Sequence, residues 1–216
     1  MKRSPLLSWL SRETSQMHRQ LESTPLLSKL LDDSISLEEV SEVLDRFLWA
    51  YRPIDRALEA SLSRFLPTYR TPLRTSLLIA DLAALGQPVR KQGTMTFTPP
   101  CTLPEILGIL YVTEGSTLGG TMIADKLEQS LARIPRQALS FFSLGGSGSP
   151  SLWEKFLVIF PSDPDSHDFS QELLRGATRT FRHFLDAFSS RDSTARPEDP
   201  QTTCLSDHHL ADSLSP

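Results

Sequence analysis

The chain has 216 residues, and its 22 basic and 26 acidic side chains leave a net charge of −4 at pH 7. This length suits one large domain or two small ones. The acidic balance lacks the basic footprint that binds nucleic acid or an anionic membrane surface, so we expect neither partner. No uninterrupted apolar run reaches the roughly 18 residues of a membrane span.

The cysteines and the first residues bear on location. Cys101 and Cys204 lie far apart and predict neither a disulfide framework nor a metal knuckle. We interpret the basic and then apolar start of the chain as a helix, because it lacks a small-residue cleavage site. A reducing, cytoplasmic location fits these features best.

Apolar residues recur at helical spacing along the first half of the chain. The first predicted helix carries a stripe made of Leu10, Thr14, Met17 and Leu21. A capping box at residues 36–39 opens the second predicted helix. Proline is tolerated in a first helical turn, so we expect Pro53 to begin a separate helix. Another helix is expected from Pro72, with Gly86 ending it.

The second half also reads as helical, with one loop and one polar end. Residues 87–102 are rich in Pro and Gly and predict a loop. Helices are expected from Pro104 to about Leu131 and near 135–143, 151–160 and 168–188, and no convincing strand pattern is present. Residues 189–216 are polar and typical of a disordered tail. The prediction is one all-α domain at 1–188, followed by a tail at 189–216.

The segment Tyr-Val-Thr-Glu-Gly-Ser-Thr-Leu-Gly-Gly at 111–120 is the most informative part of the chain. Each glycine inside a helix costs about 1 kcal/mol relative to alanine. On a helical wheel Gly108, Gly115 and Gly119 fall within about 40° of one another. A face stripped of side chains favours a ligand lying against the backbone. The alternative is close packing against another helix.

His18 lies at the edge of the first apolar stripe, and Glu22 follows one turn later. A carboxylate near one imidazole nitrogen orients the ring and leaves the other nitrogen free for a metal. This arrangement is typical of an axial haem ligand, and a partly exposed ion pair is the alternative. We expect His167 and His183 to be solvated or locally hydrogen-bonded. The sequence shows no convincing zinc pair, phosphate loop or nucleophile triad.

The two segments together resemble a known family. Residues 10–22 look like the proximal-helix motif of haem oxygenases, and residues 111–120 look like their distal-helix motif in its bacterial, phytochrome-associated form. Phe141-Phe142, Trp153-x-x-Phe156 and the segment 177–181 follow in the family's order. The resemblance covers about residues 5–188. It implies a single-domain, all-α haem oxygenase-like fold, with haem between the proximal helix and a kinked distal helix.

The resemblance implies an enzyme that cleaves haem, with O2 and electrons, to biliverdin, Fe²⁺ and CO. The electrons would come from a ferredoxin or an NAD(P)H-dependent reductase, and the biliverdin could supply a phytochrome. His18 would bind the haem iron, with Glu22 as its hydrogen-bond partner. Gly115 and Gly119 would contact the oxygen-binding face. Ser116 stands where the animal enzymes have a distal carboxylate, and it would hold a water near bound oxygen.

Further haem contacts are expected from the proximal, distal and last helices. The residues are Thr14, Met17, Tyr111, Gly120, Arg175, Arg179 and Phe181. Arg12 and Arg19 are further candidates for the propionates, since the chain has Ser11 where the family usually has a base. One alternative is a non-catalytic haem or bilin binder on the same fold. Another is a relative that has lost haem and handles a thiamin fragment or a quinone precursor.

Overall fold

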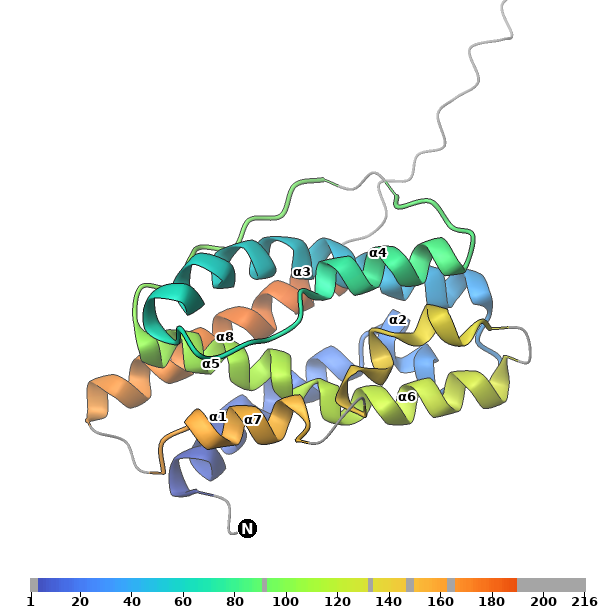
Figure 1. The fold of residues 1–216 in the computed structure, drawn as a ribbon. Coiled ribbons are helices and arrows are strands. Elements are labelled where there is room, and N and C mark those ends of the chain that lie inside the picture. Colours follow the sequence, from blue (N-terminus) through green and yellow to red (C-terminus); the bar gives the residue numbers. More distant parts are fainter. Residues whose placement is uncertain (1–3, 91–92, 132–133, 147–149, 163–165, 190–216) are drawn as a thin grey trace, which may run out of the picture.

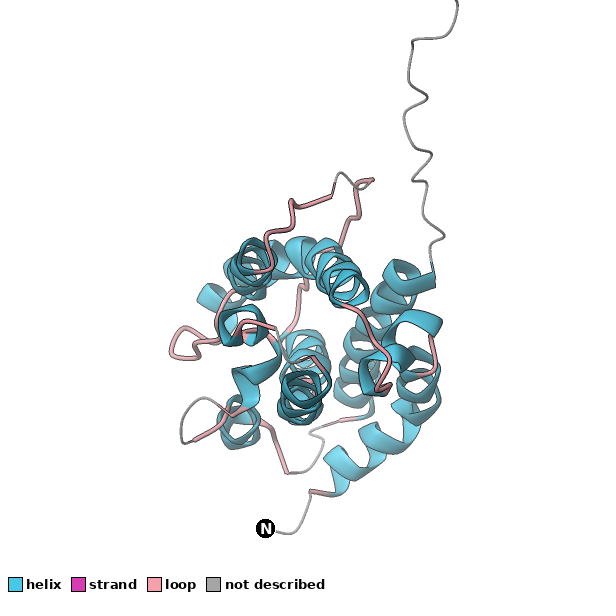
Figure 2. Ribbon diagram, turned by 90° about the vertical axis from the view of Figure 1, so that its right-hand side faces the viewer, coloured by secondary structure: helices cyan, strands magenta, loops and turns pink. Residues whose placement is uncertain are grey.

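The computed structural model describes residues 4–90, 93–131, 134–146, 150–162 and 166–189. In chain order the elements are α1 (Pro5–Glu22), α2 (Pro25–Ser28), η1 (Lys29–Leu31), α3 (Leu37–Phe65), α4 (Arg74–Ala84), α5 (Leu103–Gly115), α6 (Thr117–Ser130), η2 (Arg136–Leu139), η3 (Phe142–Gly145), α7 (Leu152–Ile159) and α8 (His167–Ser189). These residues include no strand, and the predicted all-α class is confirmed (Figures 1 and 2). The predicted tail lies outside the described residues from 190 onward, so the domain boundary stays a prediction.

Helix α3 differs from the sequence-based expectation at Pro53. The Ser36 hydroxyl and the Glu39 side chain form the predicted capping box, but Pro53 lies inside one 29-residue helix instead of opening a new one. Buried apolar residues lie on both sides of the proline, from Val40 to Leu58. Their burial outweighs the roughly 3 kcal/mol that an interior proline costs a helix. Gly86 follows α4 with a φ of 68°, so its predicted role as the end of that helix is confirmed.

The expected helix from Pro104 to Leu131 is broken into α5 and α6 at Ser116. The Ser116 hydroxyl donates to the Thr113 carbonyl at 2.9 Å, and the Thr117 hydroxyl donates to the Glu114 carbonyl at 2.6 Å. Side-chain donors thus compete for carbonyls that a continuous helix would use, and this bends the chain at the glycines. The short helix expected near 135–143 is instead the two 3-10 turns η2 and η3.

Among the described helices, α5 and α8 form the most extensive contact, and two glycines permit it. A Cβ at Gly108 would meet the Leu173 carbonyl and lie 2.7 Å from the Ala177 amide nitrogen. A Cβ at Gly176 would likewise meet the Glu105 carbonyl. The grouping of Gly108 with a ligand-facing stripe is therefore wrong, and the helix-packing alternative explains this glycine.

The α5–α6 segment is also the one helical stretch of the described chain that combines the length and the apolar composition of a membrane span. Residues Leu103–Ser130 are long and apolar enough to cross a membrane by length and composition alone. Over half of the relevant window, 56%, is buried inside the structure. Figure 1 shows α5 between α3 and α1, so the apolar residues of this segment belong to the core of the helical domain.

Candidate functional site

His18 and Glu22 form the predicted pair on α1. The Nδ1 atom of His18 lies 3.3 Å from a carboxylate oxygen of Glu22, and the His18 side chain is 56% exposed. The imidazole and the Phe181 ring of α8 pack in a T-shaped arrangement, with ring centroids 5.9 Å apart. Glu22 therefore occupies one ring nitrogen, Phe181 limits the tilt of the ring, and Nε2 is the nitrogen that can bind a metal.

A contact between Thr14 and Tyr111 links α1 to α5 one turn before the candidate ligand. The two hydroxyl oxygens lie 3.4 Å apart, and Thr14 is buried. His18 lies one turn further along α1, and Gly115 lies one turn further along α5. The two helices run in the same general direction (Figure 1). His18 shares a face of α1 with Thr14, and Gly115 shares a face of α5 with Tyr111. His18 and Gly115 are therefore expected on the same side of the Thr14–Tyr111 contact.

The two glycines nearest the break have different surroundings. A Cβ at Gly115 would lie 3.4 Å from the Trp153 ring of α7, whereas a Cβ at Gly119 would meet nothing within 4 Å. Beside Gly119, the large apolar side chains of Leu118 and Met122 are more than half exposed. Exposed apolar residues around an uncovered backbone are typical of a ligand or partner surface.

A buried ionic network supports the break, and the sequence analysis missed it. Arg74 donates to the Glu114 carboxylate at 2.7 Å, and both side chains are almost fully buried. Thr71 donates to the other Glu114 oxygen at 2.8 Å, and Arg74 also reaches the Thr113 carbonyl at 3.3 Å. This network fixes the last turn of α5 to the start of α4. An acidic residue inside the apolar α5 segment was the signal for a buried partner.

Tyr51 of α3 connects this region to the candidate distal face. Its hydroxyl lies 3.3 Å from that of Ser116, and the Arg74 guanidinium lies 5.8 Å from the centre of its ring. Burial raises the pKa of Tyr51, so the phenol stays protonated at neutral pH. Ser116 itself is exposed. A buried phenol that holds an exposed hydroxyl can fix the orientation of a water or ligand next to it.

Three expected ligand contacts lie in other environments. Gly120 faces η3, since a Cβ there would lie 2.5 Å from the Phe142 carbonyl oxygen. Arg179 pairs with Glu105 at 3.2 Å and lies over the Phe97 ring at 4.6 Å, so it has partners within the fold. Arg175 is exposed and pairs with Glu172 one turn earlier on α8. Phe181 lies beside His18, Tyr111 lies beside Thr14, and Met17 packs against the core. Their roles as haem contacts stay predictions.

The other two histidines in the described residues differ from each other. His167 is exposed, as expected. His183 is buried, and its Nε2 lies 2.9 Å from the Ala50 carbonyl oxygen of α3, so the expectation of a solvated or local arrangement was wrong for it. Burial lowers the pKa of His183. Within the described ranges, no three His, Cys, Asp or Glu side chains gather to hold a metal ion. His18 could therefore bind a metal only as a single protein ligand.

The chain is similar to known haem oxygenases in sequence. The family model described as "Heme oxygenase" matches residues 4–190. A heme oxygenase of Xanthomonas campestris is 34% identical over 126 residues, which are 57% of this chain and 70% of that protein. The heme oxygenase PigA of Pseudomonas aeruginosa is 26% identical over 176 residues, which are 80% and 86% of the two chains.

Solved structures agree on the fold. The heme oxygenase of Leptospira interrogans superposes with a TM-score of 0.64 at 16% identity, covering 85% of this chain and 98% of the other. The NO- and CO-bound heme oxygenase of Neisseria meningitidis superposes with a TM-score of 0.63 at 18% identity, covering 89% and 96%.

The chain therefore belongs to the heme oxygenase family. The expectations of a haem oxygenase fold and of a haem oxygenase enzyme are confirmed, and nothing in the comparisons favours a non-catalytic binder. Haem is the ligand that this family implies. The assignment to the phytochrome-associated type stays a prediction.

Proposed function

We propose that this chain cleaves haem to biliverdin, Fe²⁺ and CO, with haem held between α1 and the α5–α6 break. One observation carries the proposal. The Nδ1 atom of His18 pairs with Glu22, and His18 lies on α1, one turn beyond the Thr14–Tyr111 contact. This contact joins α1 to α5, the helix that ends at Gly115. A planar macrocycle with a central metal needs an axial nitrogen on one face and a surface without side chains on the other.

The residues present fit haem. His18 Nε2 is the ring nitrogen not engaged by Glu22 and can serve as a nitrogen ligand, and Gly119 has no neighbour within 4 Å of its Cβ position. The exposed apolar side chains of Leu118 and Met122 can cover porphyrin surface, which is itself largely apolar. When bound, haem supplies the iron at which O2 is activated.

Protein groups around the break would then control water and protons. Ser116 is exposed, donates to the Thr113 carbonyl and is held by Tyr51, so its oxygen can accept a hydrogen bond from a water on the distal side. Tyr51 remains a phenol because burial raises its pKa. The Arg74–Glu114 pair supports this position from within the fold. We propose that these groups orient a water that delivers protons, a role that a distal carboxylate would otherwise fill.

The propionates have several basic or hydroxyl candidates. Tyr111 is partly exposed beside Thr14, and Arg12 and Arg19 are exposed on α1. Arg175 is exposed on α8 and its pair with Glu172 lies at the surface, whereas Arg179 is largely buried and held by Glu105. We therefore favour the first four over Arg179. A ferredoxin or reductase as electron donor, biliverdin supply to a phytochrome, and a cytoplasmic location also stay predictions.

The test is a titration of the purified chain with ferric haem, followed by absorbance. A Soret band that saturates at one haem per chain is expected. His18→Ala should change the ferric spectrum, since the axial nitrogen is lost, while His167→Ala should reproduce the original because that side chain is exposed on α8. An unchanged spectrum in His18→Ala would overturn the assignment of the iron ligand.

A further inference from the structure

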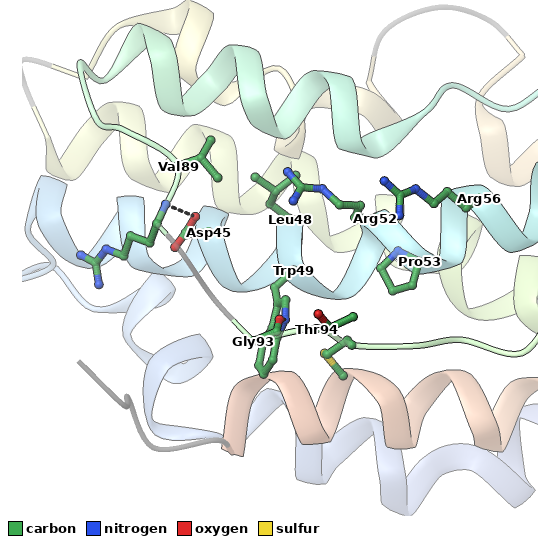
Figure 3. A pocket seen from close by; sticks show the side chains of 11 residues that line it. Asp45, Leu48, Trp49, Arg52, Pro53, Arg56, Val89, Gly93 and Thr94 are labelled. Atoms are coloured by element: carbon green, nitrogen blue, oxygen red, sulfur yellow. Dashed lines mark hydrogen bonds between the residues drawn. The ribbon is translucent and has the colours of Figure 1, made fainter. Parts of the chain in front are cut away.

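A hollow lies on α3, next to the loop that follows α4. Its volume is about 220 Å³, and Figure 3 shows it between α3 and the loop segment that carries Val89, Gly93 and Thr94. None of the residues around it comes from α1, α5 or α6. The hollow is therefore separate from the site proposed for haem.

Arginine side chains dominate the charge of this hollow. Arg52 and Arg56 are one helical turn apart, and both extend along the same edge of α3 in Figure 3. Both are exposed, and neither pairs with a carboxylate in the part of the chain that the structure describes. Like charges at this spacing repel each other. A bound anion would relieve that repulsion, and Arg90 adds a third positive charge at the rim.

The single acid in the hollow is directed to the loop backbone. A carboxylate oxygen of Asp45 accepts a hydrogen bond from the amide N–H of Arg90 at 3.3 Å (Figure 3). The hollow therefore has three arginines against one partly engaged carboxylate, on a chain whose net charge is −4. This local excess of positive charge is opposite in sign to that of the whole chain.

The opposite edge of the hollow is apolar and fixed in place. Trp49 donates its indole N–H to the Gly93 carbonyl, and the Arg46 guanidinium lies 5.8 Å from the centre of its ring. Pro53 and Met95 complete this wall. A flat apolar wall beside positive charge suits an organic body with an acidic group at one end.

We propose that this hollow binds a small organic anion, with a phosphate or carboxylate at Arg52 and Arg56 and an apolar ring against Trp49. Guanidinium groups match the oxygens of phosphates and carboxylates with paired N–H donors. The volume is below the roughly 300–1,000 Å³ of pockets for drug-sized ligands, so a molecule of about one ring fits best. The proposal does not depend on haem binding.

Phenyl phosphate is the probe, and the indole N–H signals of ¹⁵N-labelled protein in NMR spectra are the readout. The chain has three tryptophans, so a Trp49→Phe variant assigns the signal. We expect a saturable shift of the Trp49 signal alone. The dissociation constant should rise about tenfold or more in Arg52→Gln/Arg56→Gln, since charged hydrogen bonds are lost. Arg64→Gln/Arg136→Gln, two exposed arginines outside the hollow, should keep the original constant.

Several results would overturn the proposal. These are a shift that grows linearly without saturation, an unchanged constant in the Arg52/Arg56 variant, or equal shifts of all three indole signals. Two comparisons on the unaltered protein need no variant. Benzyl alcohol should bind more weakly because it lacks the anion, and inorganic phosphate should bind more weakly because it lacks the ring. Equal affinity in either comparison contradicts the corresponding half of the proposal.

Discussion

Arg74 and Glu114 form an ion pair at 2.7 Å in which both side chains are almost fully buried. Glu114 is the residue directly before Gly115, where α5 ends, and Arg74 is the first residue of α4. The pair therefore joins two helices at the bend that shapes the distal face. Variants of this pair therefore test whether buried side chains stabilise the bend.

Loss of one partner should destabilise the fold strongly. Arg74→Met leaves the Glu114 carboxylate buried without its cation, which typically costs about 3–5 kcal/mol. Glu114→Gln should also destabilise, whereas the double variant should lose less than the sum of the two because no unpaired charge remains. Urea unfolding of the four proteins measures these differences. Additive losses would show that the pair does not act as a unit.

The same substitution at Gly108 and at Gly119 should have different effects on the stability of the protein without haem. Gly108→Ala drives a Cβ into the backbone of α8, and overpacking of this kind costs about 1–3 kcal/mol. Gly119→Ala meets nothing within 4 Å and should be neutral or stabilising by up to about 1 kcal/mol. Denaturant unfolding gives both values. Equal losses would contradict the separation of a packing glycine from an open one.

Glu22→Gln should weaken haem binding without abolishing it. Loss of the carboxylate removes the group that orients His18, and such outer partners typically account for about 10–100-fold in metal affinity. Competition for haem against a protein of known affinity measures the change. Glu59→Gln, which removes an exposed acid on α3 outside the candidate site, is the control and should leave the affinity unchanged.

His183 should make stability depend on pH. Burial holds its pKa below the ordinary value in the folded state, whereas the unfolded chain takes up a proton near pH 6.5. Protons therefore favour the unfolded chain, and the free energy of unfolding should fall as the pH drops below about 6.5 toward the folded pKa. His183→Gln, which can still donate to Ala50, should lose less stability between pH 7.5 and 5.5. His167→Gln should behave like the original chain. If the free energy of unfolding depends on pH equally in the original chain, His183→Gln and His167→Gln, the pH dependence does not come from His183.

The helices and the His18–Glu22 pair could be predicted because their signals are local. Period, capping residues and i,i+4 spacing act within a few turns. The close approach of Gly108 to α8 could not be predicted, because it depends on Gly176, which lies 68 positions later. The family resemblance named Phe181 as a haem contact, but the ring contact between His18 and Phe181 was not predicted. Sequence alone could not show that Arg179 is held by Glu105, or that Pro53 lies inside a long helix, since buried neighbours decide both.

The most direct test of the central claim is a turnover experiment with the haem complex, O2 and an electron donor, with biliverdin quantified after extraction. The account predicts about one biliverdin per haem for the original chain, with loss of the Soret band. His18→Ala should form none above background, while His167→Ala should match the original. A stable Soret band without biliverdin in the original chain, or undiminished biliverdin formation in His18→Ala, would contradict it.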